Sequence, residues 1–452
     1  LVMIIAIGLF KFIDVLPGEY FLIFCILLLS LGIIFSCLIL SRHGPKKRFI
    51  GTVLGILYII ILVISIIYEL NTIDFLKKIG FKNYKTENYS IIVLNESNLN
   101  SLEELDKKRI GSLEFNTDGL KSAKEKIEKK IDSEFVVLSN INELKDDFIK
   151  KDYEGMLIEN SLLAIMQEDD ETFATSYKVI YEFNLDVEVE DITSSVDITK
   201  DPFSIYITGI DTYGTVSSVA RSDVNMVITV NPKNHKILIT SIPRDYYVEL
   251  VGKNGKDKLT HSGVYGLDTG TKTVAKLLDT KINYYIKVNF SSLIKMVDAL
   301  DGVKVYSKYN FTSKDGYYYK EGYNNVNGEK ALSFVRERMA FNEGDRMRIE
   351  NQASMVKAIF AKATSPTIIT NYSSILKTLG NSFITNLDSE DITEFIKMQI
   401  DDMPNWEITN YSLNGIDSYQ YTYTYGNVKL AVMLPDEKTI NEARTKIKEI
   451  LK

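Results

Sequence analysis

Two long runs without a charged residue dominate the first 70 residues of this chain and limit what it can fold into. Residues 20–40 and 49–68 each have the length, about 20 residues, that a helix needs to cross about 30 Å of hydrocarbon. The segment between them, SRHGPKKR at residues 41–48, is rich in Lys and Arg. Short basic loops stay in the cytoplasm. We therefore expect everything from about Asn71 onward to lie outside the cytoplasm.

A shorter apolar run covers residues 1–16, which begin with Leu and include Lys11 and Asp14. We interpret it as a third span, complete or incomplete; a secretory signal peptide is the alternative, although no A-x-A-like cleavage site follows. Both cysteines, Cys25 and Cys37, lie in the run at residues 20–40, so the outer region has no disulfide framework or thiolate zinc site. The prediction is a multi-pass cell-membrane protein with a large extracytoplasmic C-terminal region, in keeping with a Gram-positive-type bacterium.

Residues 71–200 are expected to form a small extracytoplasmic accessory α/β domain. Short apolar runs at 90–94, 108–115, 134–138 and 153–159 indicate strands, and amphipathic stretches at 120–130 and 141–151 indicate helices. The order resembles one lobe of a periplasmic solute-binding protein, and a spacer that binds no small molecule is the alternative. An acidic, polar stretch at 184–202 that ends in Asp-Pro marks the domain boundary.

Residues 201–452 predict a second, larger α/β domain. Strand-like runs rich in Ile, Val and Tyr occupy 203–210, 224–231, 236–243, 283–290 and 303–307. Helix-like segments occupy 265–278, 291–300, 328–336 and 345–363. We expect an α/β/α domain with helices on both faces of a mixed central sheet, a core at 201–365 and a tail at 366–452 that adds helices and a Tyr-rich hairpin.

Arginine is scarce in this chain and concentrated in one domain. Of 53 basic residues only 10 are Arg, and six of those lie between positions 221 and 348. Residues 201–365 carry a net charge of +6 inside a chain of −7, which favours an anionic ligand. A guanidinium holds phosphate or carboxylate bidentately, unlike an ammonium. The concentration predicts a site for a pyrophosphate, although surface salt bridges would explain it as well.

Carboxylates and one helix face complete the candidate site. Asp211 ends the first strand and Asp223 precedes the next, so neighbouring strands would bring both to one sheet edge, a suitable place for Mg²⁺. Asp345, Arg348 and Gln352 are spaced to share one face of a helix. Arg346 points away from that face and can pair with Glu350. No H-E-x-x-H, G-x-S-x-G or P-loop motif is present.

Six motifs in order carry a family resemblance. GID, RSD, SIPRD, KLTHSGVYG, VNGEKALSFVRER and GDRMRIENQ span about 200–365 and resemble the LytR-CpsA-Psr (LCP) family, whose members move glycopolymers onto the bacterial cell wall. The three-span start and accessory domain resemble the capsule-associated branch. Within the motif KLTHSGVYG, His261 is more typical of a structural residue than of a catalytic one.

The resemblance implies a role for each site residue. It makes Asp211 and Asp223 ligands of Mg²⁺ or Mn²⁺. The pyrophosphate of a polyprenyl-linked glycan would be bound by five arginines and Gln352, with Arg244, Asp345 and Arg348 catalytic and Asp345 orienting or deprotonating the acceptor. The five arginines are Arg221, Arg244, Arg336, Arg338 and Arg348. Two departures from the family pattern are the lack of an Arg near Tyr213 and Asn-Gln at 351–352, which bear on affinity or acceptor choice.

The expected enzyme is a polyprenyl-pyrophosphate-glycopolymer–peptidoglycan phosphotransferase. An acceptor hydroxyl of peptidoglycan would attack the sugar-linked phosphorus of a teichoic acid, capsule or other wall polysaccharide carrier, and polyprenyl phosphate would leave. The alternative is a membrane-tethered sensor that binds polyprenyl pyrophosphate without transferring it. A transcription regulator, and hence a nucleic-acid partner, is disfavoured because the only expected cytoplasmic segment has eight residues.

Overall fold

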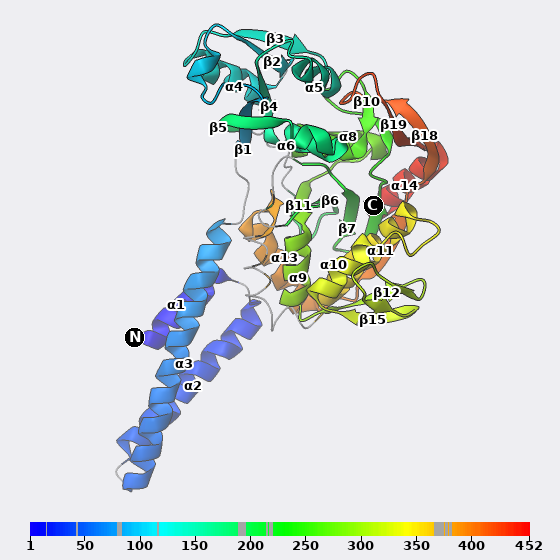
Figure 1. The fold of residues 1–452 in the computed structure, drawn as a ribbon. Coiled ribbons are helices and arrows are strands. Elements are labelled where there is room, and N and C mark those ends of the chain that lie inside the picture. The colour runs from blue at the N-terminus through cyan, green and yellow to red at the C-terminus, as the bar shows by residue number, and fades with distance from the viewer. Residues whose placement is uncertain are drawn as a thin grey trace.

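A computed structural model describes residues 1–14, 16–41, 44–78, 84–114, 117–188, 196–213, 216, 220–365, 375, 378 and 382–452. Three parts are visible: a stalk of helices, a small sheet at the opposite end, and a larger α/β domain between them (Figure 1). The order along the chain follows the order predicted from the sequence.

The stalk consists of α1 (Val2–Ile13), α2 (Gly18–Leu40) and α3 (Pro45–Lys78). Two helical segments in the described part of the chain, Gly18–Leu40 and Pro45–Leu70, are long and apolar enough to cross a membrane by length and composition. Helix α1 has 12 residues, about 18 Å of helix, which is too short to cross the hydrocarbon alone. Because α3 already begins at Pro45, the connecting loop is shorter than the predicted 41–48, and its residues 42–43 lie outside the described part.

The end of α1 packs on the larger domain rather than continuing as a span. Ile13 is buried in a cluster with side chains such as Val297 and Ile396. The next residue, Asp14, accepts a 2.6 Å ion pair from Lys397 Nζ. The N-terminal helices therefore contact the α/β domain directly.

The small domain is a five-stranded sheet of order β3-β2-β4-β1-β5. Its strands are β1 (Tyr84–Leu94), β2 (Arg109–Leu113), β3 (Glu134–Leu138), β4 (Gly155–Glu159) and β5 (Tyr177–Glu188), and its α-helices are α4 (Asp118–Glu128), α5 (Ile141–Ile149), α6 (Asn160–Asp169) and α7 (Glu171–Ala174). The four predicted strands and two predicted helices are confirmed; α6, α7 and β5 were not predicted. Part of the predicted boundary at 184–202, residues 189–195, lies outside the described residues.

The larger domain is built on a six-stranded sheet of order β16-β11-β6-β7-β8-β17. These strands are β6 (Phe203–Ile210), β7 (Val224–Asn231), β8 (Lys236–Ser241), β11 (Tyr284–Asn289), β16 (Ile384–Thr385) and β17 (Glu407–Ser412). The pairs β11–β6 and β17–β8 are parallel and the others antiparallel, which confirms a mixed sheet.

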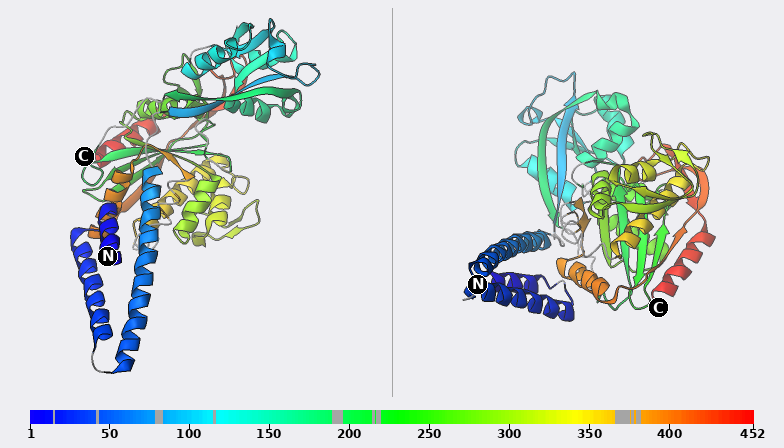
Figure 2. Two further views of the ribbon diagram at one scale, coloured as in Figure 1. Left: turned by 90° about the vertical axis from the view of Figure 1, so that its left-hand side faces the viewer. Right: turned by 90° about the horizontal axis from the view of Figure 1, so that it is seen from below.

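Helices cover both faces of this sheet (Figure 2). One face packs against α8 (Leu267–Leu278) and α14 (Glu437–Ile450), and the other against α11 (Asp345–Ala363) and α13 (Ser389–Asp402). A further cluster joins α9 (Phe290–Ala299) and α10 (Gly328–Arg336) to the small strands β12 (Val303–Ser307), β13 (Phe311–Thr312), β14 (Tyr318–Tyr319) and β15 (Gly322–Val326). Strands β9 (Tyr247–Glu249) and β10 (Lys256–Lys258) lead into the 3₁₀ segment η2 (Leu259–Tyr265).

The predicted Tyr-rich hairpin is confirmed as β18 (Gly415–Tyr421) and β19 (Lys429–Pro435). Its turn contacts the small domain: Asn142 Nδ2 donates to Tyr425 O at 2.6 Å, and Ile141 N donates to Thr424 O at 3.3 Å. Tyr425 and Val264 are buried in the hydrophobic cluster of α5 and α6. The small domain is thus docked on the larger one through the start of α5.

Candidate active site

Two carboxylates meet at one edge of the central sheet. Strands β6 and β7 pair antiparallel with Gly209 opposite Val224, so Asp211 follows β6 where Asp223 precedes β7. The amide of Asp223 donates to Gly209 O at 2.8 Å. A Cβ on Gly209 would lie 2.9 Å from Val224 Cβ, so glycine permits the close approach of the strands at this point. The neighbouring strands required by the sequence interpretation are therefore present.

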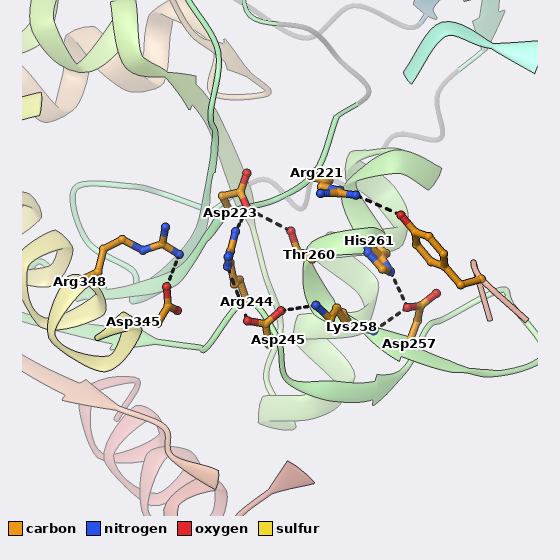
Figure 3. A network of polar contacts seen from close by, with 11 residues as sticks. Arg221, Asp223, Arg244, Asp245, Asp257, Lys258, Thr260, His261, Asp345 and Arg348 are labelled. Carbon is orange, nitrogen blue, oxygen red and sulfur yellow. Dashed lines mark hydrogen bonds and ion pairs between the residues drawn. The ribbon is translucent and has the colours of Figure 1, made fainter. Parts of the chain in front are cut away.

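Asp223 is held in an ion-pair network with residues that follow β8 and β10 (Figure 3). Arg244 NH1 donates to Asp223 Oδ1 at 2.7 Å, and Thr260 Oγ1 lies 3.5 Å from the same oxygen. Asp245 lies 3.7 Å from Arg244 Nε and 2.8 Å from Lys258 Nζ. The Arg244 guanidinium is thereby fixed between two carboxylates.

The end of α10 and the loop that follows it carry two more arginines. Arg336 ends α10 and places its guanidinium 4.5 Å from the centre of the Phe290 ring. Glu337 is buried, and its carboxylate accepts the backbone N–H groups of Lys314 at 2.6 Å and Met339 at 2.8 Å. Glu337 lies between the two arginines in sequence. Its hydrogen bonds therefore fix the backbone around Arg336 and Arg338.

The first turn of α11 contributes Arg348 and Asp345, as their spacing predicted. Arg348 NH2 lies 2.6 Å from Asp345 Oδ1, and the Arg348 side chain is only 12% exposed. Arg346 points elsewhere: its guanidinium lies 3.4 Å from Asp417 on β18. The predicted Arg346–Glu350 pair is wrong. Glu350 pairs with Lys308 instead, and Arg346 pairs with the carboxylate on β18.

These side chains line one cavity of about 660 Å³. Both carboxylates and four of the five predicted arginines contribute to its wall, together with Gln352. Away from the charged groups the wall is apolar, from the sheet and from α9, α10 and α11: Ile207, Val224, Met226, Val288, Leu293, Val335, Met355, Val356 and Ile359. An anion-binding end and an apolar slot are the two parts that a lipid pyrophosphate requires.

Burial sets the electrostatics of the cavity. It raises the pKa of the Asp211 carboxyl, an effect that the Arg336 guanidinium opposes. It lowers the pKa of the Arg348 guanidinium, opposed by Asp345. At Arg244 burial also lowers the pKa, but Asp223 and Asp245 outweigh it and the net shift is upward.

Two of the buried guanidinium groups have donor capacity that the described part of the chain does not use. The Nε atoms of Arg244 and Arg348 are buried and make no hydrogen bond to a described group. Asp245 is near Arg244 Nε but too far for one. Buried donors are normally satisfied, so both are available to acceptors of an anionic ligand in the cavity.

The fifth predicted arginine, Arg221, lines an adjoining cavity of about 270 Å³ that also includes Asp211 and Asp223. Its NH2 donates to the Tyr425 hydroxyl at 3.1 Å. The Tyr425 ring lies 5.4 Å from the ring of buried His261, whose Nδ1 is 2.6 Å from Asp257 Oδ1 (Figure 3). This neighbourhood agrees with the structural role expected for His261.

Asp345 is not among the described residues that line either cavity. It contacts the site through its ion pair with Arg348. Sequence reasoning missed Lys314, Asp315 and Glu337 in the larger cavity and Tyr425 beside the smaller one. Lys314 and Asp315 belong to a turn with an ordinary Lys-Asp-Gly sequence, which carries no functional signal. Tyr425 lies about 200 residues from its partner in sequence, so only the fold reveals the contact.

The two carboxylates also fit a Mg²⁺ ion. No cluster of three or more His, Cys, Asp or Glu suited to a metal occurs among the described residues. Mg²⁺ does not require one, because it is commonly bound by one or two carboxylates, substrate phosphates and water. Asp211 and Asp223, at the polar end of the cavity, are such a pair.

An α/β/α domain whose sheet edge joins carboxylates and buried arginines to an apolar cavity wall defines a class of proteins with a site suited to an amphipathic anion. The model of the LytR_cpsA_psr family matches residues 170–442, and the chain belongs to this family. A teichoic acid transferase TagU from Bacillus cereus, named as acting between polyisoprenyl-teichoic acid and peptidoglycan, is 37% identical over 209 residues, or 46% of this chain and 68% of the relative. TagU from Bacillus licheniformis is 36% identical over 201 residues, 44% of this chain and 65% of the relative.

Solved structures of similar proteins include B. subtilis TagU, with 30% identity and a TM-score of 0.44 over 56% of this chain and 98% of the other. TagT bound to LIIa-WTA has 27% identity and a TM-score of 0.46, over 57% of this chain and 94% of the other.

Proposed function

We propose that this protein is a phosphotransferase that moves a glycopolymer from a polyprenyl-pyrophosphate carrier to peptidoglycan. The observation that carries the proposal is the single cavity in which four arginines and two carboxylates stand at the end of an apolar slot. Family membership and relatives named as teichoic acid transferases support a teichoic acid as the polymer. Capsule or another wall polysaccharide is the alternative cargo.

In this proposal the apolar slot binds the polyprenyl chain and the arginines bind the pyrophosphate. Asp211 and Asp223 would hold Mg²⁺ or Mn²⁺, which supplies charge neutralisation at the phosphate oxygens. The acceptor hydroxyl forms a new bond to the sugar-linked phosphorus while the bond from that phosphorus to the bridging oxygen breaks. Polyprenyl phosphate leaves, and the hydroxyl proton passes to Asp345, which adjoins the site through its ion pair with Arg348 and is not needed to hold the metal.

Each arginine then has a defined part. Arg244, fixed by Asp223, and Arg348, fixed by Asp345, direct buried donors at the developing charge. Arg336 and Arg338 approach from the loop that Glu337 organises. Because these donors are held by the protein before the substrate arrives, little reorganisation is needed during transfer.

We place this chemistry at the outer face of a cell membrane, with α2 and α3 as the anchor. The apolar composition of both helices and the direct contact of α1 with the larger domain support the placement. A lipid-linked donor would then reach the slot from the bilayer on which the domain stands.

The test is polymer attachment by purified full-length protein. Lipid-linked glycopolymer and isolated wall fragments are mixed with Mg²⁺, and polymer covalently bound to the wall is measured beside retention of the lipid donor. Transfer that depends on enzyme and metal supports the proposal. Donor retention without transfer, under conditions in which the wall fragments accept polymer from a known transferase, would favour the tethered sensor instead.

A further inference from the structure

The two carboxylates of the site separate two cavities of different character. Among the described lining residues, the cavities of about 660 Å³ and about 270 Å³ share only Ile210, Asp211 and Asp223. Every other described lining residue belongs to only one of the two cavities, so the two carboxylates can be reached from two directions. The smaller cavity lies between the two domains.

The wall of the smaller cavity that comes from the small domain is mainly polar. Hydroxyl, amide and carboxylate side chains come from β1 and from the β4–α6 junction, and two apolar side chains lie beside them. The residues of this wall are Thr86, Glu87, Asn88, Glu159, Asn160, Ser161, Ala164 and Ile165. Hydroxyl, amide and carboxylate groups suit the hydroxyls of a sugar, and the apolar pair suits the carbon face of its ring. A volume of about 270 Å³ is at the low end for small-molecule sites and matches one sugar unit better than a chain.

The chemistry of the proposed transfer says which sugar belongs there. In phosphoryl transfer the attacking and leaving oxygens lie roughly in line on opposite sides of phosphorus. The leaving group is polyprenyl phosphate, whose chain requires the apolar slot of the larger cavity. The attacking hydroxyl must therefore approach across the carboxylates, from the side of the smaller cavity.

We propose that the interdomain cavity is the binding site for the acceptor sugar of peptidoglycan, and that the small domain forms part of it. This inference rests on the proposed transferase function and adds the location of the second substrate. It also gives the small domain a direct role in catalysis rather than that of a spacer.

The docking of the domains fixes the shape of this cavity. Asn142 of α5 holds the carbonyl of Tyr425, and the hydroxyl of Tyr425 holds Arg221, which lines the cavity. On the other side of the same turn, Thr424 N donates to Asp257 Oδ2 at 2.7 Å. These contacts hold the two domains, and therefore the wall of the cavity, in one arrangement. A reactive hydroxyl must be held in a defined position to attack efficiently.

The closing experiment fills the cavity without removing any polar group. Ala164 is an exposed residue of α6 that lines the cavity, and Ala164→Trp places a large ring there. Ala174→Trp is the matched control, because Ala174 is also exposed, lies in the same domain and is not among the residues lining this cavity. Both full-length variants are checked for wild-type melting temperatures.

Two quantities are measured: binding of a soluble disaccharide fragment of peptidoglycan, and transfer at varied fragment concentration with donor retention in parallel. We expect Ala164→Trp to weaken fragment binding and raise its KM at least tenfold while donor retention stays unchanged, and Ala174→Trp to match wild type. Wild-type fragment binding by Ala164→Trp overturns the inference, and so does loss of donor retention, which would assign the cavity to the donor. If wild type binds the fragment but transfers nothing, the transferase proposal fails, while the binding difference still locates the sugar site.

Discussion

Replacing Arg244 with Lys tests whether the site needs the shape of a guanidinium or only its charge. Arg244 makes a 2.7 Å charge-assisted bond to Asp223, stands 3.7 Å from Asp245 and keeps one buried N–H for a ligand. A Lys ammonium preserves the charge but cannot direct separate donors at a carboxylate and a phosphate.

The size of the effect follows from the bond that is lost. A hydrogen bond to a charged group contributes about 1.5–3 kcal/mol. If the lost bond acts in the transition state, the rate falls by about 10- to 150-fold, at about 1.4 kcal/mol for each factor of ten. Donor retention should fall by less than about tenfold, because the positive charge remains.

The assay is attachment of glycopolymer to wall fragments, with donor retention measured on the same preparations. Arg346→Lys is the matched control: its side chain is 46% exposed and pairs with Asp417 at 3.4 Å, and such surface pairs contribute only about 0–1 kcal/mol. If Arg244→Lys transfers polymer within about twofold of wild type, or if Arg346→Lys loses as much, the assignment of Arg244 to the transition state is wrong.

Three further changes test other parts of the interpretation. Asp211→Asn should remove Mg²⁺-stimulated transfer while leaving the melting temperature near that of wild type; equal transfer in chelator by the unaltered protein would refute a metal at this position. Glu337→Gln should lower the free energy of unfolding by about 1–3 kcal/mol, because a neutral amide replaces an acceptor of several backbone N–H groups, whereas exposed Glu321→Gln should change it little. In intact cells of a variant without native cysteines, an impermeant thiol reagent should label Asn98→Cys but not Pro45→Cys, both at exposed positions, and the opposite pattern would reverse the topology.

Much of the fold was predictable because its elements carry strong local signals. Strands β6 and β7 and helices α10 and α11 have the predicted bounds, since runs rich in Ile, Val and Thr specify the strands and three- to four-residue apolar spacing specifies the helices. Strand β5 was not predicted, although the alternation of apolar and polar residues in the second half of Tyr177–Glu188 is typical of a half-buried strand. It pairs along the whole of β1, and such a long-range pairing is not encoded in either segment alone.

The site was predictable where residues are close in sequence and not where the fold joins distant segments. The spacing of Asp345 and Arg348 predicts that they share one face of a helix, and their ion pair shows that they do. The partner of Arg346 was predicted incorrectly, because the carboxylate that it meets belongs to the hairpin 71 residues later. The same limit hid the Tyr425–Arg221 contact and the cavity between the domains.

The contact between α1 and α13 has a consequence for where in the wall the protein can work. Ile13 is buried in the core of the larger domain and Asp14 is ion-paired with Lys397, so this domain is mounted on the stalk instead of hanging from a free tether. With α2 and α3 in a bilayer, the contact between α1 and α13 sets the distance from the membrane surface of both the donor slot and the proposed acceptor cavity. Such a mounting would confine the proposed transfer to glycan strands lying next to the membrane. Strands farther from the membrane would lie beyond the reach of the cavity.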